Sequence, residues 1–189
     1  MTCDPSPPPV SGDASLAALA QFAQQTGDVL GMVVSTTAAP NVSGMARIRT
    51  RSRRAELTVD ERVLQLPATA QRTVVAHELG HVATRRAGVT LSLAAIGVAA
   101  VGSVVLAVQA PQWALLGWAV TGLAFLGLLL ALRQSELAAD EWAAQMGWPF
   151  DQAHIESLDD AGLLVTPRLE VLSTHPAPQT RLHAMQGAA

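Results

Sequence analysis

The chain has 189 residues, of which 50% are hydrophobic, 14% are charged and 4% are aromatic. So much apolar surface at a net charge of only −3 excludes a largely disordered protein, and 12 basic against 15 acidic residues argue against nucleic acid as a partner. The charged fraction lies well below the roughly 25% of an ordinary soluble domain. The single cysteine, Cys3, excludes an intramolecular disulfide.

The first part of the chain has the pattern of a small α+β unit. Residues 1–13 are rich in proline and are expected to form a disordered tail, without the basic start or the apolar core of a signal peptide. The elements that follow are predicted from hydrophobic spacing and turn residues. They are a helix over residues 14–25 that Gly27 ends, a strand over 29–35, one or two further strands over 45–50 and 55–66, and a helix from Thr69 to Arg86.

Residues 87–132 contain no Asp, Glu, Lys or Arg. Pro111 and Gln112 divide this stretch into two apolar parts, residues 90–110 and 113–132. Because a bilayer core about 30 Å thick needs about 20 helical residues, each part is long enough to span it. We therefore predict a transmembrane helical hairpin. The alternative is a buried hairpin in a soluble core, but the rest of the chain could hardly cover two helices that are apolar all round.

The charges beside the hairpin predict its orientation. Arg85 and Arg86 precede the first span and Arg133 follows the second, whereas the connecting turn carries no charge. By the positive-inside rule, both termini and the polar domain lie in the cytoplasm. The hairpin is then a multi-pass anchor in the inner (plasma) membrane. The composition, rich in Ala and Arg and free of Lys, suggests a bacterial source. Further helices are expected over residues 135–146, 151–161 and 179–186.

A possible metal site begins at His77-Glu78-Leu79-Gly80-His81. On a helix, residues i and i+4 share a face, so the imidazoles of His77 and His81 can bind the same zinc ion. Glu78 then stands beside the metal as the carboxylate that takes a proton from its water. Chance predicts only roughly 0.01 occurrences of this pattern in a chain of this composition, so two unrelated surface histidines are the weaker interpretation.

A catalytic zinc site needs a third protein ligand and an open position for water. Glu136 lies 55 residues beyond His81, but two antiparallel spans would return the chain to the side of the membrane that it left. Glu136 would then lie near the helix of His81, and Asp140, one turn later, could accept the outer N–H of a zinc-bound histidine. The alternative is a solvated helix face, to which we assign the neighbouring Glu141.

The order of these motifs resembles a known family. Residues from about 40 to 181 are similar to the HtpX-like and CAAX-prenyl-endopeptidase family of gluzincin metallopeptidases. The motifs that carry the resemblance are His77-Glu78-Leu79-Gly80-His81, Glu136-x-x-Ala139-Asp140 and His175-Pro176-x-x-x-x-Arg181. The resemblance implies an α+β, zincin-like core into which the two-helix hairpin is inserted.

The resemblance also implies a role for each residue of the motifs. It implies that one zinc ion per chain is held by three ligands, namely His77, His81 and Glu136. It implies that Glu78 is the general base and acid. It also implies that Asp140 contacts a metal ligand without binding the metal itself. It further implies that His175 and Arg181 bind substrate and stabilise the tetrahedral intermediate.

The residues themselves favour part of this last assignment. Zinc proteases need a donor for the developing oxyanion, often Tyr or His, and the chain has no Tyr. This leaves His175 and Arg181 as donors, although His175 could also be an ordinary loop residue before a proline. His154 and His183 lack such neighbours and are expected at the surface. Either residues 45–50 or residues 55–64 could supply the edge strand that pairs with an extended peptide.

We therefore predict a zinc metalloendopeptidase whose catalytic domain comprises residues 14–86 and 133–189 and whose anchor comprises residues 87–132. Its expected partners are protein or peptide substrates and the lipid bilayer. An anchor that consists of the internal hairpin alone favours membrane protein quality control or regulated proteolysis over CAAX processing. One alternative is an antirepressor-type sensor protease, which would need a sensor domain from a partner. The other is a catalytically silent zinc-binding membrane adaptor, against which the intact Glu78 argues.

Overall fold

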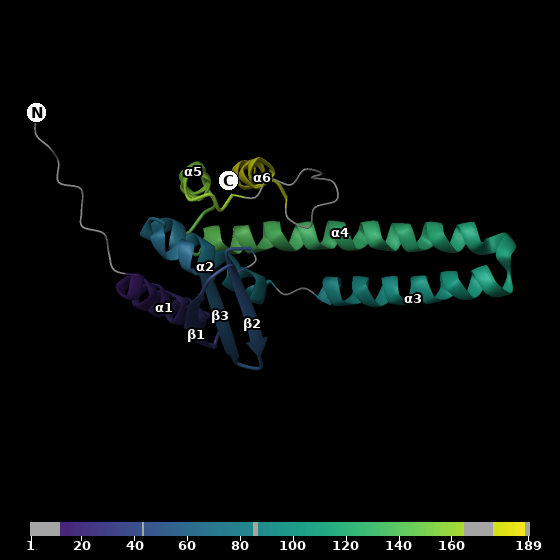
Figure 1. Ribbon diagram of the computed structural model, residues 1–189, viewed down its shortest axis with the longest axis horizontal. Helices are drawn as coiled ribbons and strands as arrows, with labels where there is room; N and C mark the ends of the chain where they lie inside the picture. The colour runs from purple at the N-terminus through teal and green to yellow at the C-terminus, as the bar shows by residue number, and fades with distance from the viewer. Residues whose placement is uncertain (1–11, 43, 85–86, 165–175, 188–189) are drawn as a thin grey trace, which may run out of the picture.

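The computed structural model describes residues 12–42, 44–84, 87–164 and 176–187, and it has a mixed α+β architecture dominated by helices (Figure 1). The predicted tail lies outside the described residues up to residue 11, and the first helix already begins at Gly12. The elements in chain order are α1 (Gly12–Val29), β1 (Val33–Ala39), β2 (Ala46–Arg51), β3 (Arg54–Asp60), the 3₁₀ helix η1 (Glu61–Gln65), α2 (Ala68–Ala83), α3 (Ala87–Gln109), the 3₁₀ helix η2 (Pro111–Trp113), α4 (Ala114–Gln145), α5 (Gln152–Asp160) and α6 (Pro178–Gly187).

The three strands form one sheet in the order β1-β3-β2, with β3 parallel to β1 and antiparallel to β2. Successive side chains of a strand point to opposite faces, and accordingly Ala55, Leu57 and Val59 of β3 share one face and are buried. They pack in one core with Leu19 of α1 and Val75 of α2. This core holds α2 against the sheet, and β2 forms one edge of that sheet.

The turn between α1 and β1 begins later than the sequence predicts. Helix α1 continues past Gly27 to Val29, and the chain turns at Gly31, whose φ of +65° favours glycine. Gly27 lies inside the helix, where a Cβ atom would be 2.3 Å from Cγ2 of Val34. This glycine therefore permits close packing of α1 on β1 and does not end the helix, and β1 starts only at Val33.

Strand β3 ends at Asp60 and does not continue to residue 66 as predicted. The carboxylate of Asp60 accepts hydrogen bonds from the guanidinium and the backbone N–H of Arg62 and from the backbone N–H of Val42. The side-chain hydrogen bond from Arg62, supported by the two backbone donors, lowers the pKa of Asp60 to about 2. Asp60 thus caps η1, and the cap turns the chain from the sheet towards α2.

Helices α3 and α4 form an antiparallel hairpin that extends away from the sheet and the other helices (Figure 1). At their contact a Cβ atom on Gly117 would be 3.0 Å from Cα of Ser103, and the Ser103 hydroxyl oxygen lies 2.6 Å from the Gly117 carbonyl oxygen. Small residues of this kind let two helices approach closely.

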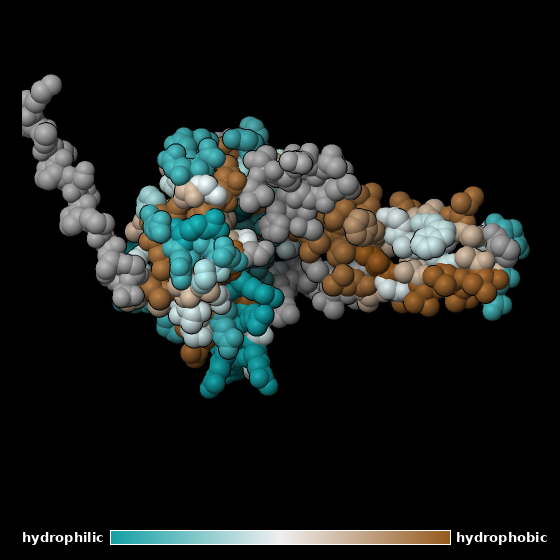
Figure 2. All heavy atoms as spheres, viewed as in Figure 1, coloured by the Kyte–Doolittle hydropathy of each residue, from teal (hydrophilic) through white to brown (hydrophobic). Residues whose placement is uncertain are grey.

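The surface of the hairpin is apolar. Figure 2 shows large hydrophobic side chains along it, and exposed examples are Val98, Leu115 and Leu123. Among the described residues, α4 is the one helix long and apolar enough to cross a membrane, and α3 contributes a shorter apolar helix over Leu93–Gln109. Only 17% of the most apolar window of α4 is buried against the other described residues.

Candidate metal centre

Two histidines of α2 direct their imidazoles at the same point. Their spacing of four residues places them on one face of the helix, while Val75 and Leu79 of the same helix are buried in the core. The imidazole rings of His77 and His81 meet edge to face with centroids 4.6 Å apart, and their Nε2 atoms are 3.1 Å apart. The packing of α2 therefore fixes two nitrogen donors side by side at the edge of the core.

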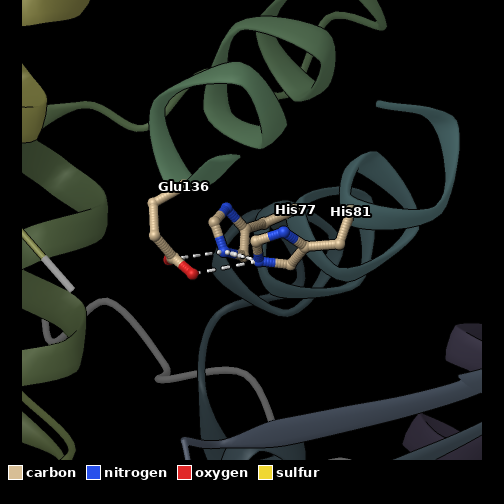
Figure 3. A group of neighbouring side chains, drawn as sticks. All are labelled: His77, His81 and Glu136. Atoms are coloured by element: carbon tan, nitrogen blue, oxygen red, sulfur yellow. Dashed lines mark hydrogen bonds and ion pairs between the residues drawn. The ribbon is translucent and has the colours of Figure 1, made fainter. Parts of the chain in front are cut away.

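Glu136 of α4 completes this group, as Figure 3 shows. Its carboxylate oxygens lie 3.4 Å from Nε2 of His77 and 3.4 Å from Nε2 of His81. The approach depends on Gly80, because a Cβ atom there would be 2.6 Å from the carbonyl oxygen of Ala139 in α4. A glycine between the two histidines thus lets α4 come close enough to add a carboxylate.

The spacing of these donors fits a metal ion. Zinc bonds of about 2.0–2.1 Å in a tetrahedral site separate neighbouring ligand atoms by about 3.3 Å. The Nε2 atoms of His77 and His81 are 3.1 Å apart, and they lie 3.4 Å from Oε2 and from Oε1 of Glu136, respectively. With one ligand atom from each residue, the three atoms all lie within 4.8 Å of one another, close enough to share one ion. Two imidazole nitrogens and one carboxylate oxygen are also a donor set that leaves a fourth tetrahedral position open. These three residues could therefore hold a metal ion.

Asp140 orients one of the two histidines. Its Oδ1 lies 2.7 Å from Nδ1 of His77, and the carboxylate is almost completely buried. A neutral imidazole that donates its Nδ1–H to Asp140 presents the lone pair of Nε2 to the metal position. In the metal-free protein, burial disfavours the charged form of His77, but hydrogen bonds to Asp140 and Glu136 outweigh it and raise the pKa of His77 to about 9. Metal binding would therefore displace a proton.

Arg181 of α6 forms hydrogen bonds with the carboxylate of Asp140. Its Nε donates to Oδ2 of Asp140 over 2.7 Å, and its Nη2 donates to Oδ1. Burial alone would raise the pKa of Asp140, but the hydrogen bonds from Arg181 and His77 lower it to about 2. The guanidinium also stacks on Phe150, with Cζ 3.9 Å from the ring centroid. Arg181 thus compensates the buried charge that orients His77, and it lines the cavity described below.

Glu78 follows His77 directly and is only partly exposed. Burial raises the pKa of its carboxyl to about 7, and the nearby charge of Glu136 adds to this effect, although His77 and Arg181 oppose it. A carboxylate with a pKa near the working pH can both accept and release a proton. A carboxyl group with a raised pKa therefore lines the same cavity as the three residues that could hold a metal ion.

A cavity of about 400 Å³ opens at these residues. Its polar wall includes His77, Glu78, His81, Glu136, His154 and Arg181, together with Arg62 and Thr73. The remaining wall is largely apolar and includes Phe150, Leu158, Leu163 and Leu164. A cavity of this size with a few convergent polar groups is typical of a substrate site.

The other residues considered from the sequence have different positions. His154 was expected at the surface, but it is 5% exposed and lines the cavity, because its place on α5 directs it inward together with Leu158 four residues later. His183 and Glu141 are exposed, as expected. His175 lies outside the described residues.

Sequence reasoning missed two residues that shape the site. Gly80 is the only glycine of α2, and a glycine in a helix interior is a signal of close packing that could have been used. His154 shares the i, i+4 spacing of a buried helix face with Leu158, a signal that is weak in a helix of nine residues.

The comparisons with known proteins agree with the geometry. A family model described as peptidase family M48 matches residues 59–189, more than two thirds of the chain. None of the curated proteins compared with the chain matches it. The matched region begins near the end of β3 and contains the two histidines of α2, the acidic residues of α4 and Arg181 of α6. A family match over this region, together with three side chains that can hold a metal ion, shows that the chain belongs to peptidase family M48 and is a metallopeptidase.

Proposed function

We propose that this metallopeptidase is a zinc-dependent endopeptidase that cleaves protein or peptide substrates at the cytoplasmic face of a membrane. The observation that carries the proposal is the convergence of His77, His81 and Glu136, whose ligand atoms lie within 4.8 Å of one another, with Glu78 beside them in one cavity. A structural zinc site has four protein ligands, whereas three ligands and a neighbouring base are typical of a catalytic one.

Each residue of the site has a distinct task in peptide-bond hydrolysis. When bound, the zinc ion supplies Lewis acidity, which polarises the scissile carbonyl and acidifies water. Glu78 accepts the proton of the attacking water and delivers it to the leaving amine. Asp140 holds the imidazole of His77 in the tautomer that binds metal, and Arg181 keeps Asp140 ionised. The proposal keeps His175 as a donor to the developing oxyanion.

The substrate would bind as an extended strand along β2. Of the two segments that the sequence left open, β3 is the central strand, whereas β2 pairs with β3 alone among the strands that the structure describes. Ile48, Arg49 and Thr50 of β2 form a groove together with His81. A peptide that extends the sheet here would pass directly beside the metal position and would be held mainly through its backbone.

The hairpin supports the membrane part of the proposal. Its exposed surface is apolar over most of its length, and such surface is stable only against lipid or another protein. The charges that flank residues 87–132 favour a cytoplasmic location for the catalytic domain. We propose a role in membrane protein quality control or regulated proteolysis, because the hairpin holds the catalytic site close to the bilayer.

Glu78→Gln separates metal binding from catalysis. We expect the variant to retain one zinc per chain, because Glu78 is not a ligand, but to cleave casein at least about a hundredfold more slowly than the wild type. Zinc content is measured by elemental analysis of detergent-purified protein, and cleavage with and without a chelator. The matched control is Glu141→Gln, which neutralises an exposed glutamate of α4 and should leave both readings unchanged.

The same measurements identify the alternatives. Cleavage by Glu78→Gln at the wild-type rate would contradict the proposed base. A wild-type protein that binds one zinc ion but cleaves nothing would favour the silent adaptor. A protein that purifies without metal and gains none from added zinc would contradict the metal centre itself.

A further inference from the structure

His154 occupies an unusual position for a polar residue. It lies on α5, is 5% exposed, and contributes to the wall of the same cavity as the metal-centre residues. Its imidazole meets the ring of Phe150 edge to face, with centroids 5.1 Å apart. The guanidinium of Arg181 stacks on Phe150 as well, so a continuous set of contacts connects His154 with Asp140 and the metal centre.

Among the described residues, His154 has a buried imidazole nitrogen without a hydrogen-bond partner. This nitrogen is Nδ1, whereas the backbone N–H of the residue donates a hydrogen bond to Oδ1 of Asp151. Burying a polar nitrogen without a partner destabilises a fold, and an apolar residue of similar shape would avoid that cost. A requirement other than stability therefore explains the histidine at this position.

The surroundings of His154 keep the imidazole neutral. Burial lowers its pKa to about 4, and the positive charge of Arg181 acts in the same direction. The negative charges of Asp151 and Asp140 oppose this shift without reversing it, and His77 adds to it. A neutral imidazole has one N–H donor and one acceptor nitrogen, so it can bind an uncharged polar group of either kind.

We propose that His154 is a substrate-binding residue that hydrogen-bonds an uncharged polar side chain of the peptide inside the cavity. This inference rests on the proposed function. The neighbouring wall is apolar through Phe150, Leu158 and Leu163, so the side chain that enters would have an apolar body and an uncharged polar end. Tyr, Thr and Gln fit this description, whereas a charged group placed against His154 would lose hydration for which one hydrogen bond to a neutral imidazole does not compensate.

The main test is peptide binding by variants of position 154. Fluorescently labelled casein peptides are titrated into zinc-loaded Glu78→Gln protein, which should bind without cleaving, and into the same protein with His154→Phe or His154→Gln. We expect His154→Phe to be at least as resistant to thermal unfolding as its parent but to bind the best peptide about tenfold more weakly. His154→Gln should recover part of the affinity, because its amide restores a donor and an acceptor.

A cleavage profile gives the specificity directly. On a peptide library analysed by mass spectrometry, the wild type should prefer Tyr, Thr or Gln at one position beside the cleaved bond. His154→Phe should shift that one preference to Phe or Leu and leave the other positions unchanged. Unaltered peptide affinity and an unaltered profile in His154→Phe would overturn the inference, and so would the failure of both variants to fold, which would make His154 a structural residue.

The design separates this inference from the proposed function. If the wild type cleaves peptides and the variant of position 154 behaves like it, only the inference fails. If Glu78→Gln protein binds peptides through His154 but the wild type does not cleave them, the proposed function fails and the binding site remains. If no peptide binds at all, both fail.

Discussion

At the scale of single residues, the site depends on a buried carboxylate that is not itself a proposed metal ligand. Asp140 is 1% exposed and accepts hydrogen bonds from two sides, from His77 and from Arg181. A buried charge with fewer partners would be strongly destabilising. Because both partners are present, Asp140 can fix the tautomer and the orientation of His77 without a large loss of stability.

Replacing Asp140 by Asn should weaken metal binding. The amide has nearly the shape of the carboxylate but is a weaker acceptor for the Nδ1–H of His77, and loss of such an outer partner lowers metal affinity by about 10–100-fold. Competition of the purified protein with a chromogenic zinc chelator measures this affinity. Asp159→Asn, at an exposed position of α5, is the matched control. Wild-type zinc affinity in Asp140→Asn would contradict the orienting role.

The sequence predicts these residues unequally. The positions of His77 and His81 follow from helix periodicity alone, because four residues in a helix always bring two side chains to one face. The approach of Glu136 requires the hairpin to return the chain, which the uncharged stretch indicated. The burial of His154 could not be predicted, because it depends on how α5 packs beside Phe150 and the metal centre, and the sequence of α5 does not specify that packing.

At the scale of elements, the contact between α2 and α4 assembles the site. The helix of the two histidines and the helix of Glu136 touch at Gly80, whose missing side chain leaves room for the backbone of Ala139. Backbone atoms cannot move aside as the end of a flexible side chain can. The distance between the two helices, and hence between the three metal-binding side chains, is therefore set by one glycine.

Gly80→Ala should push the two helices apart. Its Cβ atom would lie 2.6 Å from the Ala139 carbonyl oxygen, so we expect the free energy of unfolding to fall by about 1–3 kcal/mol and zinc content to fall as Glu136 moves away. Thermal unfolding followed by circular dichroism and elemental analysis measure the two effects. Gly122→Ala is the control, since a Cβ atom on this α4 glycine would meet nothing within 4 Å. Equal stability and equal zinc content in both variants would contradict the prediction, because they would show that a methyl group fits between α2 and α4 at position 80.

Element types could be predicted from the sequence more reliably than element ends. The helices and strands between Gly12 and Ala83 have the expected order, but α1 extends past Gly27 and β3 stops at Asp60. Both differences come from contacts between distant residues: Gly27 packs against Val34, and Asp60 accepts the N–H of Val42. Glycine and aspartate have several structural uses, and a single sequence does not show which one applies.

At the scale of the whole molecule, one helix belongs to both parts of the protein. Helix α4 runs without interruption from the tip of the hairpin to Gln145 (Figure 1). Its first half is apolar, and its second half carries Glu136 and Asp140. All 27 charged residues lie outside residues 87–132. The low charge content of the chain is therefore a property of the hairpin, and the position of the hairpin in a membrane would directly orient the helix that completes the metal centre.

If the hairpin crosses the bilayer, its tip and the catalytic domain lie on opposite sides. Single-cysteine variants test this on a Cys3→Ser background, with Gln112→Cys at the exposed tip and Asp159→Cys on α5. In intact spheroplasts, a membrane-impermeant maleimide should label position 112 but not position 159, because the positive-inside rule places the arginine-flanked domain in the cytoplasm. After lysis, both should react. Labelling of neither position before lysis would mean that the apolar hairpin is covered by another protein or lies in the membrane surface, and labelling of position 159 alone would reverse the orientation.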